Sequence, residues 1–499
     1  MITRLPRLED QRQRSPIWIT RTLILAASLV ALVPSDARAQ ELAGLVKRLF
    51  DEVTINASTP NPANPAANID HSSHFFLGGE NLTLAVRQLN VALAAQLASF
   101  PLASSSGGFT FGLGPTGEIV PTSTTFGPLF AERGVTIGLK QLNFGFTFQG
   151  TNYSAFDGQS FESASSGLAF ISQHNDCCPA TGPLSPSNTT DFNPAFERDL
   201  LQSTLRATIE TKTAAFFANY GVTDRFDVGV AVPIVSVNID ARVDAEILRL
   251  GSTETSTTHS FNSSGAKTNA ADENGSATGL GDILLRAKYN VYRTTTMALA
   301  AALDLRLPTG DKDNLLGTGA TQMQGMFVAS GEYGRMSPHL NFGYTFSSGE
   351  TSALAASDDI PQTHSNNGAP IPNVTLNQPD LSVPDEVNYT FGFDVAATPQ
   401  LTLGFDLRGR TIRGVPRFDL VDSTYPNRGP GALPQPAFTA QDEFGLEPTQ
   451  GNYNQMLGVV GGKINLGGTF LLNLSLLFPL TDAGLKPKPT PVVGFDYVF

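Results

Sequence analysis

The chain has 499 residues, which suffices for two or three soluble domains or for one large barrel with long loops. Only 15% of the residues are charged and the formal net charge is −13, which argues against a nucleic-acid partner because a phosphate backbone is bound by clustered lysine and arginine. The 47 glycines and 33 prolines are spread along the whole chain, and helix-favouring charged residues are scarce.

The N-terminus has the pattern of a secretory signal. Residues 4–21 include five arginines, residues 22–33 are mostly apolar, and Ala37-Arg38-Ala39 follows. This order predicts a signal peptide over residues 1–39 that is cleaved before Gln40. The apolar run is shorter than the roughly 20 residues of a membrane-spanning helix. No later segment has 18 uninterrupted apolar residues, so the mature chain could cross a membrane only as a closed barrel.

Residues 40–106 are expected to form two helices joined by a linker. A short helix is expected over Leu42–Val53 and a linker over Pro60–Pro65. A longer helix is expected over residues 80–99, where apolar residues recur at spacings of three and four: Leu82, Val86, Leu89, Leu93 and Leu97. This helical segment could plug the lumen of a barrel, lie on the membrane surface, or form a periplasmic cap.

The two cysteines, Cys177 and Cys178, are adjacent and exclude a long-range disulfide framework. Residues 174–179 hold four potential metal ligands, but they read as a loop, and adjacent cysteines fit one tetrahedral ion poorly. A vicinal disulfide is the favoured state and no metal site is expected. The pair His71 and His74 is a weaker signal, because no acidic partner is in register.

From Leu205 onward the chain alternates between apolar and polar residues with a period of two. Residues 205–217 and 226–234 form two such runs around a tight turn at 221–225. After Pro233 the apolar residues change to the other parity, which is typical of a β-bulge.

Further strand pairs follow with short turns near residues 294, 335, 399 and 466. Between the pairs lie long polar segments, Arg249–Thr278, Ser348–Asp385 and Arg413–Asn454. Short turns alternating with long loops indicate an outer-membrane β-barrel whose short turns face the periplasm. With front strands at Gly107–Leu113, Ala131–Leu139 and Leu142–Gly150, we expect an all-β, antiparallel transmembrane barrel of about 14 strands, to within two.

The C-terminal strand resembles the closing strand of bacterial outer-membrane barrels. Its apolar face ends on an aromatic residue and is formed by Val493, Phe495, Tyr497 and Phe499. The resemblance implies a membrane-insertion signal, with outer-membrane lipids and the barrel-assembly machinery as partners. We expect a monomer in the outer membrane of a Gram-negative cell.

Three motifs carry a family resemblance: Tyr220–Gly229, Gly279–Asp282 and Leu307–Asp311. They are similar to segments of a bacterial outer-membrane family named for the MetA pathway of phenol degradation, and the similarity covers roughly residues 107–499. It implies a signal-bearing barrel that transports aromatic or other hydrophobic compounds. No site residue is carried over.

The alternation predicts which ionisable side chains face the lumen, because a Lys or Arg on the lipid face costs about 2–4 kcal/mol near the bilayer midplane. These residues form either a charged constriction that selects solutes or a salt-bridged interior that keeps the barrel packed. The candidate pore-lining residues are Arg206, Glu210, Lys212, Asp282, Arg286, Lys288, Asp304, Arg306, Asp406, Arg408 and Arg410, with Asp227, Asp240, Arg242, Asp244 and Asp394 on the same predicted face.

Catalysis is not expected. His339 is the only histidine in a predicted strand, and its apolar neighbours turn it inward together with Asn341 and Thr345. Asp394 and Asp406 could face each other in the lumen, but paired acids are common in pores. No nucleophile elbow, zinc-binding helix or phosphate loop is present, so we expect no catalytic residue and no cofactor.

The predicted organisation is a signal peptide (1–39), a helical and linker segment at the periplasmic mouth (40–106) and a barrel (107–499). The expected function is passive uptake of small organic, hydrophobic or aromatic solutes. The alternative is a surface-display or adhesion barrel with a filled lumen, whose long loops bind the partner.

Overall fold

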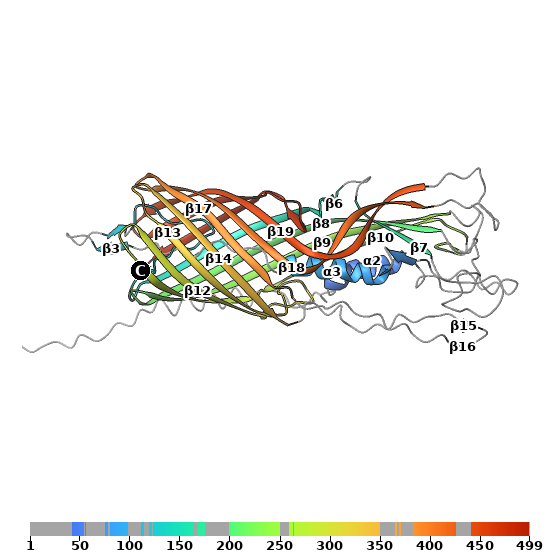
Figure 1. The fold of residues 1–499 in the computed structure, drawn as a ribbon, viewed down its shortest axis with the longest axis horizontal. Coiled ribbons are helices and arrows are strands. Elements are labelled where there is room, and N and C mark those ends of the chain that lie inside the picture. Colours follow the sequence, from blue (N-terminus) through green and yellow to red (C-terminus); the bar gives the residue numbers. More distant parts are fainter. Residues whose placement is uncertain are drawn as a thin grey trace, which may run out of the picture. The chain divides into compact units, whose positions relative to one another are not determined.

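Figure 1 shows the protein as a computed structural model. The structure describes residues 42–53, 55, 75–77, 80–97, 111–113, 119–121, 123–162, 167–174, 199–249, 259–262, 264–349, 365–366, 369–370, 383–425 and 441–498. Residues 1–39, Cys177, Cys178, His71, His74 and Phe499 lie outside these ranges, so the predictions that concern them stay predictions.

Both helices predicted from the apolar spacing are confirmed. They are α2 (Leu45–Glu52), which follows a 3-10 turn η1 (Leu42–Gly44), and α3 (Leu82–Leu97). No helix in the described ranges is long and apolar enough to cross a bilayer. The short strands near the helices and in the loops are β1 (Phe75–Leu77), β2 (Glu80–Asn81), β3 (Phe111–Leu113), β4 (Ile119–Pro121), β6 (Gln159–Ser160), β15 (Ser365–Asn366), β16 (Ala369–Pro370) and β21 (Leu485–Pro487).

Twelve antiparallel strands form a closed ring, because β22 pairs with β5 from Val492↔Gln149 to Val498↔Asn143. In ring order they are β5 (Leu142–Phe156), β8 (Leu200–Thr223), β9 (Phe226–Leu248), β11 (Ile283–Arg293), β12 (Met297–Leu307), β13 (Thr321–Gly331), β14 (Met336–Ser348), β17 (Glu386–Thr398), β18 (Leu401–Tyr425), β19 (Gln441–Gly467), β20 (Phe470–Pro479) and β22 (Thr490–Val498).

The ring confirms the predicted fold class and has two strands fewer than the expected 14. The predicted strand Leu142–Gly150 is part of β5. The predicted strand Ala131–Leu139 is wrong, because this segment has no strand pairing. Within 107–113, β3 pairs only with β4 and not with the barrel.

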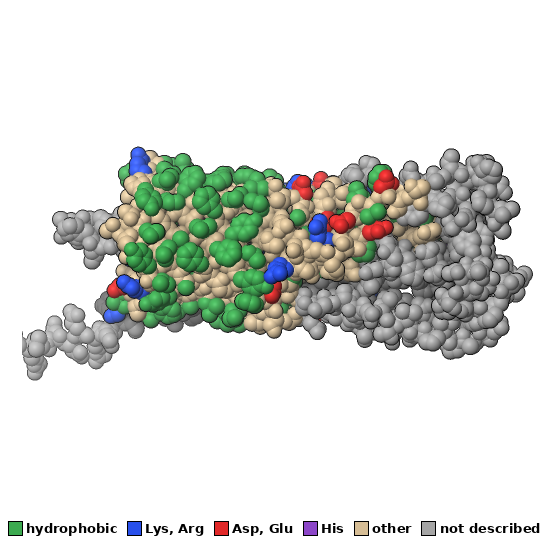
Figure 2. Space-filling model, in the orientation of Figure 1, with side chains coloured by type: hydrophobic (Ala, Val, Ile, Leu, Met, Phe, Trp, Pro, Cys, Tyr) green, Lys and Arg blue, Asp and Glu red, His purple; other side chains and the backbone are tan. Residues whose placement is uncertain are grey.

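The outer surface of the ring is apolar and the inner surface is polar, as the alternation predicts. On β14, Phe342 is 55% exposed while its neighbour Asn341 is 4% exposed. Figure 2 shows apolar side chains gathered over the barrel part of one face. Apolar patches of this extent are not left exposed to water in soluble proteins, so this band contacts lipid.

The outer face of β8 and β9 changes from apolar to polar part-way along each strand. Near the short turns, Phe216 points outward and is 47% exposed, whereas near the long loops Leu205 points inward and is 1% exposed. The register of β8 with β9 is continuous from Leu200↔Leu248 to Gly221↔Asp227, with Pro233 opposite Ala215. The predicted β-bulge at Pro233 is therefore wrong. The parity of the apolar residues changes because the surroundings of the strand change along its length. The register of β9 with β8 stays regular.

Beyond the lipid-facing band, long strands continue on the side of the long loops. The outer parts of β8, β9, β18 and β19 are joined there by β7 (Leu168–His174) and β10 (Thr268–Leu280) (Figure 1). We call this part the extension. Its inner face packs against α2 and α3 in one apolar core whose members include Leu42, Leu45, Leu49, Leu89, Leu93, Leu205, Ile209, Ile239, Val243, Phe170 and Phe418.

Two segments predicted as polar loops are in fact strands of the extension. Residues 268–278 of Arg249–Thr278 belong to β10, and β18 and β19 reach far into Arg413–Asn454. The strand β10 escapes prediction because its inward residues are small or polar and form no apolar stripe. A Cβ on Gly275 would lie 2.5 Å from Cδ2 of Leu42 in η1 and 3.4 Å from Cδ1 of Leu45 in α2, so the glycine lets these side chains pack closely on β10.

The helices lie at the opposite end of the barrel from the expected periplasmic mouth. Val498, the last residue of β22, donates its amide to Thr469 O (3.3 Å) at a short turn. In contrast, Gln96 of α3 hydrogen-bonds Leu485 in the loop between β20 and β22. Figure 1 shows α2 and α3 among the long strands, away from the C-terminus. The helices lie at this end because their apolar side chains are buried in the core of the extension.

Cysteine labelling tests the change of face. In a background lacking Cys177 and Cys178, Glu210→Cys should react with a membrane-impermeant maleimide on intact cells, because residue 210 faces water. Phe216→Cys should react only with a lipid-soluble reagent, and Leu205→Cys with neither before unfolding. Reaction of Leu205→Cys with the lipid-soluble reagent alone would contradict the assignment.

Candidate functional site

Residues 123–139 cross the interior of the barrel without strand pairing, and we call them the lumen segment. Its backbone amides donate hydrogen bonds to inward side chains of four strands, β18, β14, β13 and β9. The pairs are Phe126 N to Thr402 Oγ1 (2.9 Å), Phe130 N to Asp406 Oδ2 (2.7 Å), Glu132 N to Asn341 Oδ1 (2.7 Å), Gly134 N to Ser330 Oγ (3.0 Å) and Ile137 N to Asp227 Oδ2 (2.9 Å). These side chains thus accept the backbone hydrogen bonds that a neighbouring strand would otherwise accept.

A buried charged network holds the middle of the lumen segment. Arg133 pairs with Asp394, with 2.8 Å between Nη2 and Oδ2. His339 bridges the two acids, with Nε2 2.5 Å from Asp406 Oδ1 and Nδ1 3.4 Å from Asp394 Oδ1. His339 therefore faces inward as predicted, and Asp394 and Asp406 meet at it. Removing one partner of such a buried pair typically costs about 3–5 kcal/mol.

A second charged group fixes Glu132 of the lumen segment to β11. Arg286 donates to both carboxylate oxygens of Asp304, with Nε 2.6 Å from Oδ1 and Nη2 2.5 Å from Oδ2. Arg286 also binds Glu132, and Lys288 Nζ lies 3.3 Å from Glu132 Oε2. The bidentate geometry is the strong form of an arginine–carboxylate contact.

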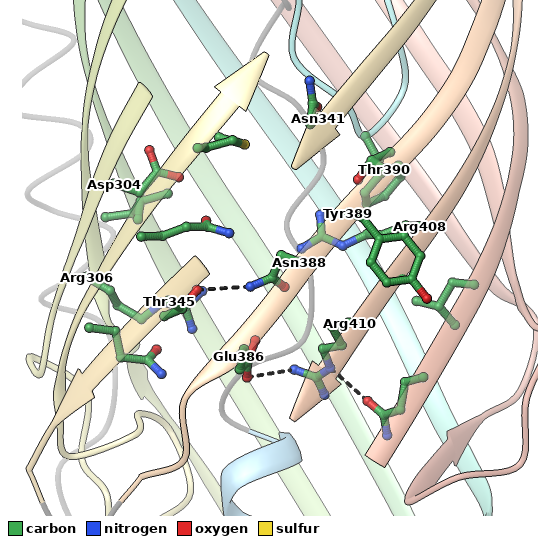
Figure 3. Close-up of a pocket in the computed structure, with 18 of the residues that line it drawn as sticks. Asp304, Arg306, Asn341, Thr345, Glu386, Asn388, Tyr389, Thr390, Arg408 and Arg410 are labelled. Atoms are coloured by element: carbon green, nitrogen blue, oxygen red, sulfur yellow. Dashed lines mark hydrogen bonds and ion pairs between the residues drawn. The ribbon is translucent and has the colours of Figure 1, made fainter. Parts of the chain in front are cut away.

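Between the lumen segment and α3 the barrel contains a cavity of about 170 Å³ (Figure 3). Phe130 and Glu132 of the lumen segment border it on one side, and Gln96 of α3 borders it on the other. Its wall includes the ionisable residues Arg286, Asp304, Arg306, Glu386, Arg408 and Arg410. The interior is therefore neither empty nor fully packed.

The C-terminal end of α3 is fixed above this cavity by Gln96. Its Oε1 accepts hydrogen bonds from Gln455 Nε2 (2.5 Å) and Leu485 N (2.7 Å), while its Nε2 donates to Ala92 O (2.9 Å). Gly484 makes this approach possible: its φ is +64°, and a Cβ there would lie 2.3 Å from Gln96 Oε1. The cavity thus has a helix end on one side and an extended segment on the other.

Residues 187–407 match the family model described as "Putative MetA-pathway of phenol degradation". This match includes all three motifs and confirms the resemblance over residues 187–407, a shorter range than the expected 107–499. The closed ring and its apolar outer band identify a membrane-spanning β-barrel. Comparison with curated proteins gives no match.

Several solved structures of membrane barrels are similar at low identity. An outer membrane channel from Pseudomonas putida F1 is 12% identical, with 73% of this chain and 97% of that chain covered and a TM-score of 0.34. The toluene transporter TbuX of Ralstonia pickettii is 12% identical, with 81% and 99% covered and a TM-score of 0.31. A TodX mutant described as a monoaromatic hydrocarbon channel is 10% identical, with 73% and 92% covered and a TM-score of 0.31. At such values the function of this chain rests on its own residues.

The first phenol-degradation motif, Tyr220–Gly229, anchors the end of the lumen segment. Gly221 exchanges backbone hydrogen bonds with Lys140 and Gln141 (2.7 and 3.0 Å), and a Cβ on Gly221 would lie 1.7 Å from Gly138 O. Asp227 in the same motif accepts the amide of Ile137. This motif therefore holds the backbone at the point where the lumen segment leads into β5.

The other two motifs of the family, Gly279–Asp282 and Leu307–Asp311, lie together at the outer end of β11. Asp282 accepts the amides of Gly310 (3.0 Å) and Thr318 (2.8 Å). Thr309 Oγ1 accepts the amide of Ile283 (3.0 Å) and donates to Gly281 O (2.8 Å). Asp282 thus orders the loop between β12 and β13 and does not border the cavity.

The structure places most of the other predicted lumen residues on the inner side. Arg286, Asp304, Arg306, Arg408 and Arg410 border the cavity. Lys288, Asp227, Asp394 and Asp406 instead bind the lumen segment or its network. Pore lining itself stays a proposal.

Arg206, Glu210 and Lys212 do not face the lumen, and this prediction is wrong. They alternate with Leu205, Ala207 and Ile209, whose side chains pack in the core of the extension. The same holds for Asp240, Arg242 and Asp244 on β9, and the resulting outward ion pairs are Arg206–Asp244, Arg242–Asp244 and Arg242–Asp272. Asp240 also lies on this outer face and is exposed. The reason is that water, not lipid, contacts this part of the strands.

Three functional residues were missed: Glu132, Arg133 and Glu386. The adjacent charges Glu132-Arg133 were a usable signal, because a lipid-facing strand would not carry one of them outward at mid-depth. Of the predicted insertion signal, Val493 and Tyr497 are exposed on the outer face of β22, and Phe495 stacks on Phe470 with centroids 5.7 Å apart.

Asn341 tests the anchoring of the lumen segment, since its side chain both accepts from Glu132 N and donates to Glu132 O (3.0 Å). Asn341→Leu leaves both groups unsatisfied at about 1–3 kcal/mol each, so amide exchange at residues 130–134 should quicken about tenfold or more. Hydrogen–deuterium exchange with mass spectrometry measures it. Asn388→Leu is the control, because Asn388 binds Thr345 and not the segment. Equal protection in both variants would refute the anchor.

Proposed function

We propose that this protein is an outer-membrane channel for passive uptake of small organic solutes of hydrophobic or aromatic character. The observation that carries the proposal is the cavity enclosed by the ring between α3 and the lumen segment. The name of the matched family, which refers to phenol degradation, agrees with aromatic solutes. No cofactor and no energy coupling are part of the proposal.

The route passes the end of α3, crosses the cavity and leaves past the lumen segment. The lumen segment is held through single hydrogen bonds and ion pairs to side chains. Each such neutral hydrogen bond contributes about 0.5–1.5 kcal/mol net, since water can replace it. A segment held in this way can shift to let a solute pass, whereas a continuous apolar core could not without exposing its side chains.

The path of the protein to the membrane belongs to the same proposal. Residues 1–39 direct export and are removed, and the strand ending Val493, Phe495, Tyr497 and Phe499 is read by the barrel-assembly machinery. The short turns then face the periplasm, and the extension with α2 and α3 projects from the cell. In the alternative function, an adhesion scaffold, the extension would bind the partner and the lumen would conduct nothing.

Arg133→Gln tests the gating role of the lumen segment. It removes the buried pair with Asp394, so the segment should be less firmly held and single-channel conductance in planar bilayers should rise several-fold. Arg242→Gln, on the outer face of the extension, is the control and should match the native protein. Liposome swelling in arabinose gives a second readout. Absence of conductance and swelling in both the native protein and Arg133→Gln would favour the scaffold.

A further inference from the structure

The cavity is richer in arginine than in carboxylate, although the chain as a whole is acidic. Four arginines border it, Arg286, Arg306, Arg408 and Arg410, against three acids, Glu132, Asp304 and Glu386. The whole chain has a formal charge of −13. A positive interior in an acidic protein is a local feature that composition does not explain.

All three carboxylates of the cavity are already engaged by two of the arginines. Arg286 binds both Asp304 and Glu132. Arg410 lies 3.6 Å from Glu386 and donates from Nε to Gln455 Oε1 at 2.7 Å. The acidic side chains therefore leave positive charge in the cavity uncompensated.

Arg408 has neither a hydrogen bond nor an ion pair among the residues that the structure describes. Across the sheet it faces Thr390 on β17 and Leu457 on β19, which carry no charge. Along its own strand, Asp406 is taken up by His339 and the amide of Phe130. Arg408 is within electrostatic reach of three arginines, Arg410, Arg306 and Arg286, and of one carboxylate, Glu386, which Arg410 already contacts. Figure 3 shows its guanidinium among the polar residues of the cavity wall.

The wall opposite Arg408 carries an apolar patch beside the polar Asn219 and Arg286. Phe217 of β8, Ala231 of β9 and Leu284 of β11 border the cavity and pack together. In the ring of twelve, β9 and β18 are six strands apart, so they stand on opposite sides. The cavity thus offers a cation on one wall and an apolar surface on the other.

A guanidinium remains charged at any physiological pH, and its planar donors match a carboxylate. We propose that Arg408 binds the carboxylate of a small organic anion whose aromatic or aliphatic body contacts Phe217, Ala231 and Leu284. This inference rests on the proposed channel function and names the class of solute. It narrows the solutes from neutral hydrophobic compounds to amphiphilic monocarboxylates.

Benzoate and its neutral counterpart benzyl alcohol are the probes. Calorimetric titration of the detergent-solubilised full chain should show benzoate binding that Arg408→Gln weakens about tenfold or more, as expected for loss of a hydrogen bond to a charged group. Arg408→Lys keeps the charge and should retain part of the affinity. Arg206→Gln removes a charge from the outer face and should bind benzoate like the native chain. Heat-modifiable gel mobility shows that each variant is folded.

Zero-current potentials in a KCl gradient provide the second arm. The native channel should prefer anions, Arg408→Gln should lose most of that preference, and Arg206→Gln should keep it. Benzoate binding that is equal in the native chain and Arg408→Gln, or absent from both, overturns the anion site. Binding that depends on Arg408 in a protein without conductance would instead overturn the channel and leave the anion site standing.

Discussion

A backbone that crosses lipid must satisfy its own amides and carbonyls, and this constraint governs the whole chain. The ring meets it by pairing β22 with β5. The lumen segment faces the same constraint inside the barrel, where no strand remains to pair with it. Its amides are accepted by Asp227, Asn341, Ser330, Thr402 and Asp406. Much of the inward polarity is therefore structural, because it replaces a missing strand.

The same strands serve two environments, and this explains their pattern. In the band that contacts lipid, apolar side chains point outward and polar ones inward. In the extension, the outer face meets water and the inner face meets α2 and α3, so the preference reverses along a regular strand. A strand can change environment at no cost in backbone hydrogen bonds, because only the side chains need to change. Gly275 shows how closely the inner face is fitted to the helix.

Sequence reasoning succeeded where one environment persists along a strand. For β11, β12 and β14 the period-two pattern assigned Arg286, Asp304 and His339 to the inside, where the structure has them. It failed for Arg206 on β8, because alternation alone does not say whether lipid or a protein core lies beside the apolar face. It also failed for residues 131–139, since the partners of an extended segment in a lumen come from distant strands and leave no local pattern. The ring order that sets Arg408 opposite Phe217 is likewise a property of closure, not of any one segment.

The demand for hydrogen-bond acceptors also shapes the charge of the cavity. Asp227, Asp282 and Asp406 each accept a backbone amide, and Asp394 pairs with Arg133. These carboxylates hold the backbone in place and therefore do not neutralise the arginines of the cavity wall. An anchored segment inside the barrel thus leaves an arginine excess centred on Arg408, even in a chain with more acids than bases. The anchoring of the lumen segment and the positive charge of the cavity wall both follow from how the carboxylates are paired.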